Sequence, residues 1–272
     1  MIFLPASNDD VANFLHLGSK GPLHISGTEQ DRNDAEIISL AKLNSVLFYE
    51  PEEMIISVQA GISLEALQKT LAAKGQWIPT LVASESPERT LGAAIARDHF
   101  HPRSVNCGAL RTAILGGTFC TTRGEIFKSG SRVVKSVAGY DIHRAFCGSR
   151  GLFGIILDVT FKVQPLPEIF YHFVAPVEAK ERLLQFHPTS LEELPGKLLV
   201  EFAGYREDVE NDIDTLRSLG IPIEELGDSA WIDAVRNVIL LYDEKRKSEL
   251  SPEVEKLVHH VRRVFDPEGV LI

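Results

Sequence analysis

The sequence predicts an α+β fold in two parts, a larger one over residues 1–167 and a smaller one over 168–250. Three observations predict it. The 272 residues are enough for one or two domains, and 44% hydrophobic with 24% charged residues is typical of globular proteins. Short apolar runs of strand and helix period alternate along the chain with brief connectors. Pro165 and Pro167 end a strand where the charge balance changes, and we place the boundary there.

Charge and glycine are distributed unevenly along the chain. Within a net charge of −10, residues 1–85, 86–167 and 168–272 carry −6, +6 and −10. Half of the 20 glycines lie between Gly92 and Gly154. A cationic, glycine-rich segment suits close backbone approach to an anionic ligand, although a loop-rich domain with solvated charges has the same composition. The acidic total argues against nucleic acid as a partner.

The first 85 residues alternate helices and strands. Ser7 is a suitable N-cap, with Asp9 and Asp10 in the first helical turn. Further along, Leu64, Leu67 and Leu71 form an apolar stripe of helical period. The elements predicted here are a helix over 7–17, an extended segment over 22–26, strands over 45–49 and 54–60, and a helix over 64–73.

The middle block reads as a hairpin followed by a long strand. Arg123-Gly124 separates two apolar runs, and Asp141 is placed to cap a short helix that ends at Cys147. Alternation of apolar residues from Leu157 to Val163 with the polar residues Asp158, Thr160 and Lys162 predicts a strand over 155–163. The elements expected here are strands over 113–121 and 125–128, a polar loop over 129–140, and the strand over 155–163.

The acidic block repeats strand and helix in an order that fits a small sandwich of ferredoxin-like type. We expect strands over 169–175, 197–203 and 221–225, with helices over 177–186, 206–219 and 229–240. The run 243–249 reads as a charged, solvated connector, and a last helix runs from Ser251 to about Phe265.

The three cysteines and the chain start suggest a reducing compartment. Cys107, Cys120 and Cys147 match no zinc or iron–sulfur spacing, so we expect buried, reduced thiols. No signal-peptide pattern and no apolar run of the ~18 residues needed for a membrane span is seen. We therefore expect a cytoplasmic protein, or one held peripherally at the inner membrane by partner subunits.

Two motifs in the middle block carry a family resemblance. The run V-V-K-S-V-A-G-Y-D-I over 133–142 and the run C-G-S-R-G-L-F-G-I-I over 147–156 resemble the signature of FAD-linked oxidases of the vanillyl-alcohol oxidase type. Within that group they are most similar to the FAD-binding subunits of glycolate oxidase. Segments over 57–67, 88–95 and 265–269 also resemble family elements.

The resemblance implies a fold and a cofactor. The fold is a two-lobed PCMH-type FAD-binding domain, with lobes over about 1–85 and 86–167. It carries a small ferredoxin-like α+β cap domain over 168–250, and the helix and tail over 251–272 pack back on the FAD domain. The cofactor is non-covalent FAD, whose pyrophosphate and flat ring need small residues where the backbone touches them.

The resemblance also assigns cofactor-binding positions. Five segments are expected to contact the cofactor. They are a phosphate loop, a helix start, the turn after it, a loop beside the isoalloxazine and a strand start opposite that loop. Lys135 is expected to place positive charge near the flavin. The residues are Ser26, Gly27, Thr28, Thr90, Gly92, Ala93, Gly108, Ala109, Arg111, Lys135, Ala138, Gly139, Tyr140, Asp141, Gly154, Ile155 and Ile156.

The stretch 24–29 departs from the family pattern. The family has an R-G-G-G-T-K-like loop where this chain has H-I-S-G-T-E. Ile25 and Ser26 replace glycines, and Glu29 puts an anion where a cation stands in the family. Ala93 replaces a further glycine. The chain is therefore an altered FAD binder, or a relative that keeps the fold and has lost the cofactor.

The implied activity is that of a flavoprotein subunit, an FAD-dependent oxidoreductase acting on the CH–OH group of glycolate or another 2-hydroxy acid. Hydride would pass from the α-carbon to FAD, beside a second flavin subunit and an iron–sulfur subunit. The alternative is a cofactor-free structural or assembly subunit of such a complex. A nicotinamide-dependent reductase is a weaker third reading, since no G-x-G-x-x-G follows a strand.

No catalytic residue is assigned from the sequence. Tyr140, Lys135 and His101 are candidates only through the positions that the resemblance gives them. His99 and His101 form a His-x-His pair, but no third ligand lies nearby in the sequence, so we expect no metal.

Overall fold

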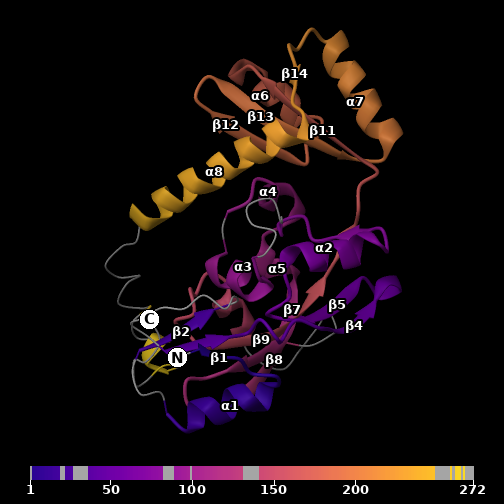
Figure 1. Ribbon diagram of the computed structural model, residues 1–272. Helices are drawn as coiled ribbons and strands as arrows, with labels where there is room; N and C mark the ends of the chain where they lie inside the picture. Colours follow the sequence, from indigo (N-terminus) through magenta and orange to yellow (C-terminus); the bar gives the residue numbers. More distant parts are fainter. Residues whose placement is uncertain are drawn as a thin grey trace.

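The computed structural model describes residues 2–18, 22–26, 36–81, 89–98, 100–130, 141–248, 258, 261–264 and 266, with the backbone alone for 243–248. Figure 1 shows a larger part below and a smaller one above, with helix α8 (Asp228–Ser248) lying between them. The large part holds the strands up to residue 165, and the small part begins at residue 169.

The chain begins with a three-stranded parallel sheet of order β1-β3-β2. Its strands are β1 (Ile2–Phe3), β2 (Leu23–Ser26) and β3 (Glu36–Ser39). Helix α1 (Asn8–His16) follows β1, and a capping box between Ser7 and Asp10 fixes its start, as the sequence predicts. The short strands β1 and β3 were not predicted, because neither has a run long enough to show a period.

A five-stranded antiparallel sheet forms the centre of the large part. Its order is β4-β5-β9-β7-β8, with β4 (Val46–Glu50), β5 (Ile55–Gln59), β7 (Ile114–Cys120), β8 (Ile126–Gly130) and β9 (Ile155–Lys162). The central strand β9 pairs with β5 on one side and β7 on the other, and is buried on both faces. Strands from both sides of residue 85 therefore share one sheet, so the sheets do not divide into lobes at that residue.

Short helices and a two-stranded ribbon complete the large part. A single hydrophobic core joins its two sheets, with Leu67 and Leu71 from the predicted apolar stripe fully buried. The remaining elements are η1 (Pro51–Glu53), α2 (Leu64–Ala72), α3 (Leu91–Arg97), α4 (Ser104–Cys107), α5 (Leu110–Ala113), η3 (Ile142–Phe146), and strands β6 (Gln76–Trp77) and β10 (Gln164–Pro165), which pair with each other.

The small part follows the order β-α-β-β-α-β, which is that of a ferredoxin-like unit. The sheet order is β12-β13-β11-β14, with all pairs antiparallel. The elements are β11 (Ile169–Ala175), η4 (Val177–Ala179), α6 (Lys180–Leu184), β12 (Ser190–Leu194), β13 (Lys197–Gly204), α7 (Arg206–Ser218) and β14 (Glu224–Glu225). Strand β12 was not predicted.

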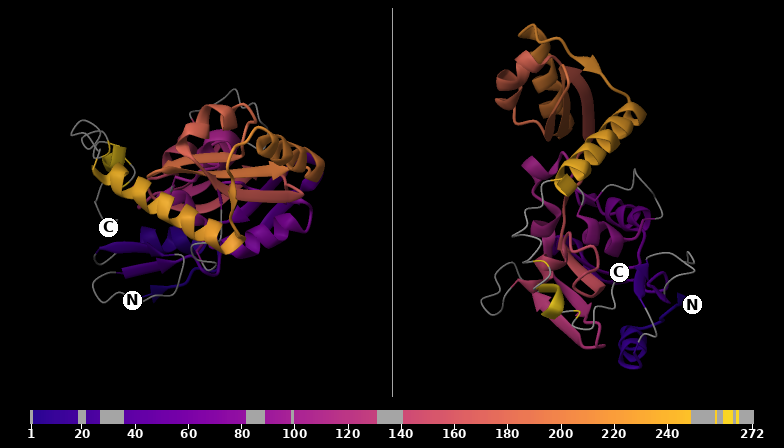
Figure 2. Two further views of the ribbon diagram at one scale, coloured as in Figure 1. Left: turned by 90° about the horizontal axis from the view of Figure 1, so that it is seen from above. Right: turned by 90° about the vertical axis from the view of Figure 1, so that its left-hand side faces the viewer.

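The two faces of the small sheet are covered differently. Alternate residues of β11 and β13, including Phe173 and Val200, pack on α6 and α7 at the outer face. The opposite face carries Leu199 against Trp231 and Val235 of α8, on the side of the large part (Figure 2). The expected connector over 243–249 is wrong through residue 248, because α8 continues to there. Its Glu, Lys and Arg residues are good helix formers.

The end of the chain returns to the large part. Of the predicted last helix, residue 258 and residues 261–264 are described, and both are helical. Val261 packs against the core of the large part. In the described portion of the chain, no helix combines the length and apolar character required to cross a bilayer.

Candidate functional site

Three segments that carry the family resemblance meet at helix α3. Leu91 at its start donates its N–H to Ile62 O at 2.9 Å, and Gly92 donates to Ala60 O at 2.8 Å. Ala60 in turn donates to Leu157 O of β9 at 2.9 Å. The segments over 57–67 and 88–95, which are distant in sequence, are therefore hydrogen-bonded to each other, and the first is also bonded to β9 directly after the segment over 147–156.

The loop before β9 lies against the same helix. Gly148 donates its N–H to Ile95 O at 3.0 Å, and Arg150 donates to Ala96 O at 2.8 Å. This loop contains the G-S-R-G-L-F-G run of the resemblance. The backbone of α3 holds this loop, and the buried side chains of Cys147 and Phe153 fix it to the core.

The predicted turn over 108–111 is tied to the end of α3. Arg111 Nη2 donates to Asp98 Oδ2 at 2.7 Å, and this hydrogen bond raises the pKa of Arg111. Asp98 is the C-cap of α3. The Arg111 side chain is half-exposed, so it keeps further N–H donors for a ligand.

Two glycines assigned to the cofactor are also required by the protein's own packing. A Cβ on Gly154 would lie 2.5 Å from Cys120 O, and one on Gly92 would lie 3.1 Å from Ala60 Cβ. The N–H of Gly92 is already bound to Ala60 O. Any contribution of Gly92 to phosphate binding would come from the close approach of its α-carbon and not from its amide.

The other assigned residues lie at three places. Ile155 and Ile156 are buried at the start of β9, paired with Cys120 and Phe119 of β7. Asp141 is exposed at the start of η3 and pairs with Arg144 at 3.3 Å, without a capping bond. Ser26 ends β2. The assigned residues that lie outside the described part of the chain are Gly27, Thr28, Lys135, Ala138, Gly139 and Tyr140.

The described residues around α3 fit an extended, anionic cofactor. Thr90 is buried at the N-cap of α3, yet its hydroxyl makes no capping bond to the helix. Gly151 has a φ of +83°, and around its absent Cβ the only described atom within 4 Å is Ile25 Cδ1 at 3.7 Å. A hydroxyl at the start of α3, a half-exposed guanidinium at its end and an open glycine face in the loop before β9 are therefore available around this helix.

Comparison with known proteins gives a family match in the first part of the chain. Residues 1–130 match the family described as FAD binding domain. The match covers just under half of the chain, and we call the large part the FAD-binding domain after it. The expected α+β fold class with a PCMH-type FAD-binding domain is confirmed by this match and by two solved structures of alkyldihydroxyacetonephosphate synthase. These have TM-scores of 0.70 and 0.65 at 16% and 18% identity, and the aligned regions cover 99% and 89% of this chain and 75% and 55% of theirs.

Curated proteins are similar to about half of the chain. The chain is 29% identical over 150 residues to glycolate oxidase subunit GlcE of Escherichia coli, covering 55% of this chain and 43% of that protein. It is 31% identical over 145 residues to D-lactate dehydrogenase of Anaerostipes hadrus, covering 53% and 30%. The chain thus spans less than half the length of these relatives. They support FAD as the cofactor and a family of FAD-linked 2-hydroxy acid oxidases and dehydrogenases.

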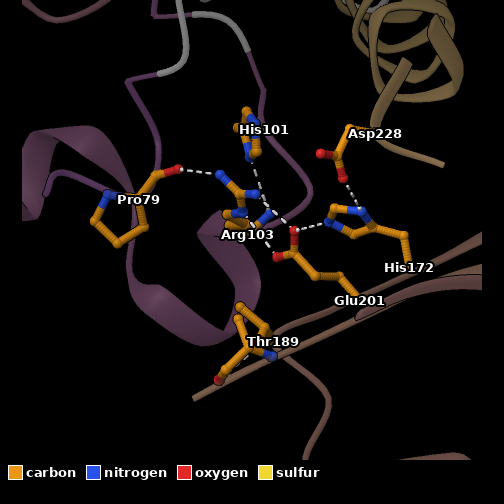
Figure 3. Close-up of polar contacts among 8 residues, drawn as sticks. Pro79, His101, Arg103, His172, Thr189, Glu201 and Asp228 are labelled. Atoms are coloured by element: carbon orange, nitrogen blue, oxygen red, sulfur yellow. Dashed lines mark hydrogen bonds and ion pairs between the residues drawn. The ribbon is translucent and has the colours of Figure 1, made fainter. Parts of the chain in front are cut away.

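A buried ion pair joins the FAD-binding domain to the small part. Arg103 Nε donates to Glu201 Oε1 at 2.7 Å, and Nη2 donates to Oε2 at 2.6 Å (Figure 3). Arg103 lies just before α4, and Glu201 is in the middle of β13. Glu201 is fully buried. Burial alone would raise the pKa of Glu201, but hydrogen bonds from Arg103 and His172 outweigh it and lower the pKa to about 2.

Aromatic rings enclose the Arg103 guanidinium. Its central carbon lies 4.9 Å from the centre of the Trp77 ring and 5.4 Å from that of Phe170. These two rings touch edge to face. The two π faces and the paired carboxylate both stabilise a cation in this position. They therefore hold the Arg103 side chain in place at the junction.

His172 extends the pair on the side of the small part. It lies directly opposite Glu201 in the β11–β13 ladder, and its Nε2 is 3.0 Å from Glu201 Oε2. Its Nδ1 is 3.6 Å from Asp228 Oδ1 at the start of α8, and its ring stacks on Trp231 with centres 4.4 Å apart. The Asp228 side chain is 92% exposed.

His101 belongs to the same junction. Its Nδ1 accepts the N–H of Arg103 at 3.1 Å. Burial, followed by the nearby charge of Arg103, lowers the pKa of His101 to about 3, so the ring is neutral near pH 7. Within the described ranges, no three or more His, Cys, Asp or Glu side chains gather in a metal-binding arrangement. His99 lies outside those ranges.

The sequence alone missed most of this junction. His101 and Arg103 stand out in the sequence as a polar cluster, but Glu201, His172 and Asp228 do not. A signal was present, since His172 and Glu201 each interrupt an otherwise apolar strand run. A buried charged residue in such a run needs a polar or charged partner. The pattern therefore predicts that a partner exists, but it does not identify that partner.

Proposed function

We propose that the chain is the FAD-binding subunit of a complex that oxidises glycolate or another 2-hydroxy acid. The observation that carries this is the convergence at α3 of the three segments that resemble the family signature. Relatives named as subunits of glycolate oxidase support a multi-subunit setting. Within it, we assign the remaining electron carriers to a second flavin subunit and an iron–sulfur subunit.

Residues around α3 have defined roles in this proposal. The hydroxyl of Thr90 and the free N–H groups of Arg111 would hold the pyrophosphate, and Gly108 and Ala109 would let the backbone approach it. Asp98 would orient Arg111 through their hydrogen bond. FAD, when bound, accepts the two electrons that leave the α-carbon of the substrate. The location that goes with this role is the cytoplasm, or the inner membrane surface through partner subunits.

Flavin content tests the proposal. The purified protein should show the flavin absorbance spectrum, or acquire it on addition of FAD. Thr90→Val should weaken FAD binding by about tenfold or more, because a hydrogen bond to a charged group is lost. Thr70→Val is the matched control, since the Thr70 hydroxyl bonds only within α2, to Ala66 O. A colourless protein that takes up no FAD would sink the proposal.

One observation favours the second candidate, a cofactor-free structural or assembly subunit. Ile25, which stands where relatives have glycine, reaches to 3.7 Å from where a Cβ would stand on Gly151. It thus fills part of the space between the two segments expected to border the cofactor. Under this reading the colourless protein would still bind its partner subunits, and Thr90→Val would leave the activity of the complex unchanged.

A further inference from the structure

Positively charged residues gather around the last turn of α3. Arg97 is exposed in that turn, and Arg111 is hydrogen-bonded to Asp98, the C-cap. Arg150 adds a third cation from the loop before β9, where its N–H donates to Ala96 O at 2.8 Å. Three guanidinium groups and one carboxylate leave these four residues with a net charge of +2. The negative end of the helix dipole accounts for one cation, but a charge of this size also suits an anionic ligand.

Arg150 has an unusual backbone conformation for its residue type. Its φ is +54°, in the left-handed region that glycine adopts freely, and the next residue, Gly151, has a φ of +83°. The hydrogen bond from its N–H to Ala96 O holds Arg150 in this conformation. A residue with a Cβ therefore lowers stability at this position compared with glycine. Such an outlier in an exposed residue indicates that the side chain has a function outside the fold.

The Arg150 guanidinium is available to a ligand. The side chain is exposed, and within the ranges that the structure describes it has no hydrogen bond or ion pair. Arg111, in contrast, is bound to Asp98. All five N–H donors of Arg150 can therefore reach a ligand. Arg97 also has no polar partner among the described residues, so its backbone conformation and its position distinguish Arg150.

Arg150 lies beside the strand that leads into the altered phosphate stretch. Ile25 of β2 is 3.7 Å from the Cβ position of Gly151, the residue next to Arg150. The stretch 24–29 that includes Ile25 has Glu29 where the family has a cation. A guanidinium on the loop that contacts β2 would replace this lost charge. It is also the side chain best suited to bind two phosphate oxygens at once.

We propose that Arg150 binds the pyrophosphate of FAD and supplies the positive charge that the stretch 24–29 lacks. This inference rests on the function proposed above, and it adds a residue outside the positions that the resemblance assigns. Arg150 and Arg111, both at the end of α3, would donate N–H groups to the phosphate oxygens from two different segments. The strained arginine and the changed phosphate stretch then have one explanation, in which one compensates for the other.

Titration of the flavin-free protein with FAD, followed by flavin fluorescence, tests the proposal. Arg150→Gln removes the charge and keeps most of the length, and should weaken FAD binding about tenfold or more, since hydrogen bonds to a charged group are lost. Arg150→Lys keeps the charge and should recover part of the affinity. Arg97→Gln is the matched control, because it removes an exposed, unpaired guanidinium from the same helix end. It should change the affinity by less than about twofold.

Arg150→Gly separates binding from folding. Because glycine relieves the left-handed backbone, the melting temperature of the flavin-free variant should rise by a few degrees, while its FAD affinity falls as in Arg150→Gln. A residue that acts only in the fold would not change these two quantities in opposite directions. Unchanged FAD affinity in Arg150→Gln, an equal loss in Arg97→Gln, or a lower melting temperature in Arg150→Gly would each overturn the proposal. Failure of the proposed function is distinguished by the unaltered protein, which would then bind no FAD.

Discussion

Arg103 and Glu201, 98 residues apart in the sequence, form a bidentate ion pair at the boundary between the FAD-binding domain and the small part. Both side chains are at least nine-tenths buried. The pair is also the point where α4, β11 and β13 come together, through Phe170 and His172. It therefore sets how the small part sits on the FAD-binding domain.

Removing one member of this pair should be far worse than removing both. Arg103→Met or Glu201→Met alone leaves an uncompensated buried charge, and should lower the free energy of unfolding by about 3–5 kcal/mol. The double variant should recover most of that loss, because methionines can fill the space without a charge. Urea denaturation of the four proteins gives the coupling energy. Additive losses in the double variant would show that the two charges do not depend on each other.

Acid should weaken the same junction in two overlapping steps. The unfolded chain protonates His101 near pH 6.5, whereas the folded protein does so only near pH 3. The unfolded chain protonates Glu201 near pH 4.5, whereas the folded protein protonates it only near pH 2. In both cases the unfolded state binds protons first, so stability present at pH 7 is lost as the pH falls from about 6.5 to 2.

His101→Asn separates the two steps. Asparagine keeps an acceptor for the Arg103 N–H but does not titrate, so the variant should lose less stability between pH 6.5 and 4.5 than the unchanged protein does. His143, whose pKa is also lowered by burial, accounts for part of the loss that remains. The control is His16→Asn, since His16 is exposed at the end of α1. Thermal melting across pH 3–7 measures this. An unchanged pH profile for the His101 variant would contradict the assignment.

Gly61 should tolerate no side chain. A Cβ there would lie 1.9 Å from Leu40 O, and a main-chain oxygen at that distance cannot rotate away. Gly61→Ala should therefore lower stability by several kcal/mol or prevent folding. Gly227→Ala is the comparison, since no described atom lies within 4 Å of its Cβ position, and it should change stability by less than about 1 kcal/mol. Soluble yield and melting temperature distinguish the two.

The thiols should be slow to alkylate in the folded protein. Burial raises the pKa of both Cys120 and Cys147 to about 12, and also raises that of half-buried Cys107. At pH 8 few of them are thiolates, so iodoacetamide should modify Cys107 slowly and the other two hardly at all. Mass spectrometry of native and urea-unfolded samples measures this. Rapid modification of Cys147 in the native sample would contradict its burial.

Local signals in the sequence predicted many elements of the fold, and tertiary context decided the rest. Ser7 and the alternation over 155–163 fix α1 and β9 because caps and period need no distant partner. Strand β12 was missed because Glu192 and Glu193 hide its pattern, and it is stabilised by pairing with β13. Helix α8 extends beyond its predicted end because the Glu, Lys and Arg residues of the run over 243–248 are good helix formers.

The candidate sites divide in the same way. The segments at α3 were found through motifs, since a cofactor-binding stretch keeps its residues together in sequence. The Arg103–Glu201–His172 junction was not, because its members come from three separate elements and nothing local says which will meet. The sequence showed Arg103 within a polar cluster, and His172 and Glu201 as polar interruptions of two apolar strands, but not that the three would meet.

The place of β9 in the sheet has a consequence for the newly made chain. Strands β5 and β7 do not pair with each other, and each is joined to the sheet through β9. The family match ends at residue 130, before β9 begins at Ile155. A nascent chain that has emerged from the ribosome up to residue 130 therefore contains two separate hairpins, β4–β5 and β7–β8. The edges that later pair with β9 are still unpaired, and such edges are prone to aggregation. The five-stranded sheet can close only after about thirty more residues have emerged, and the edges of β5 and β7 stay unpaired throughout this interval.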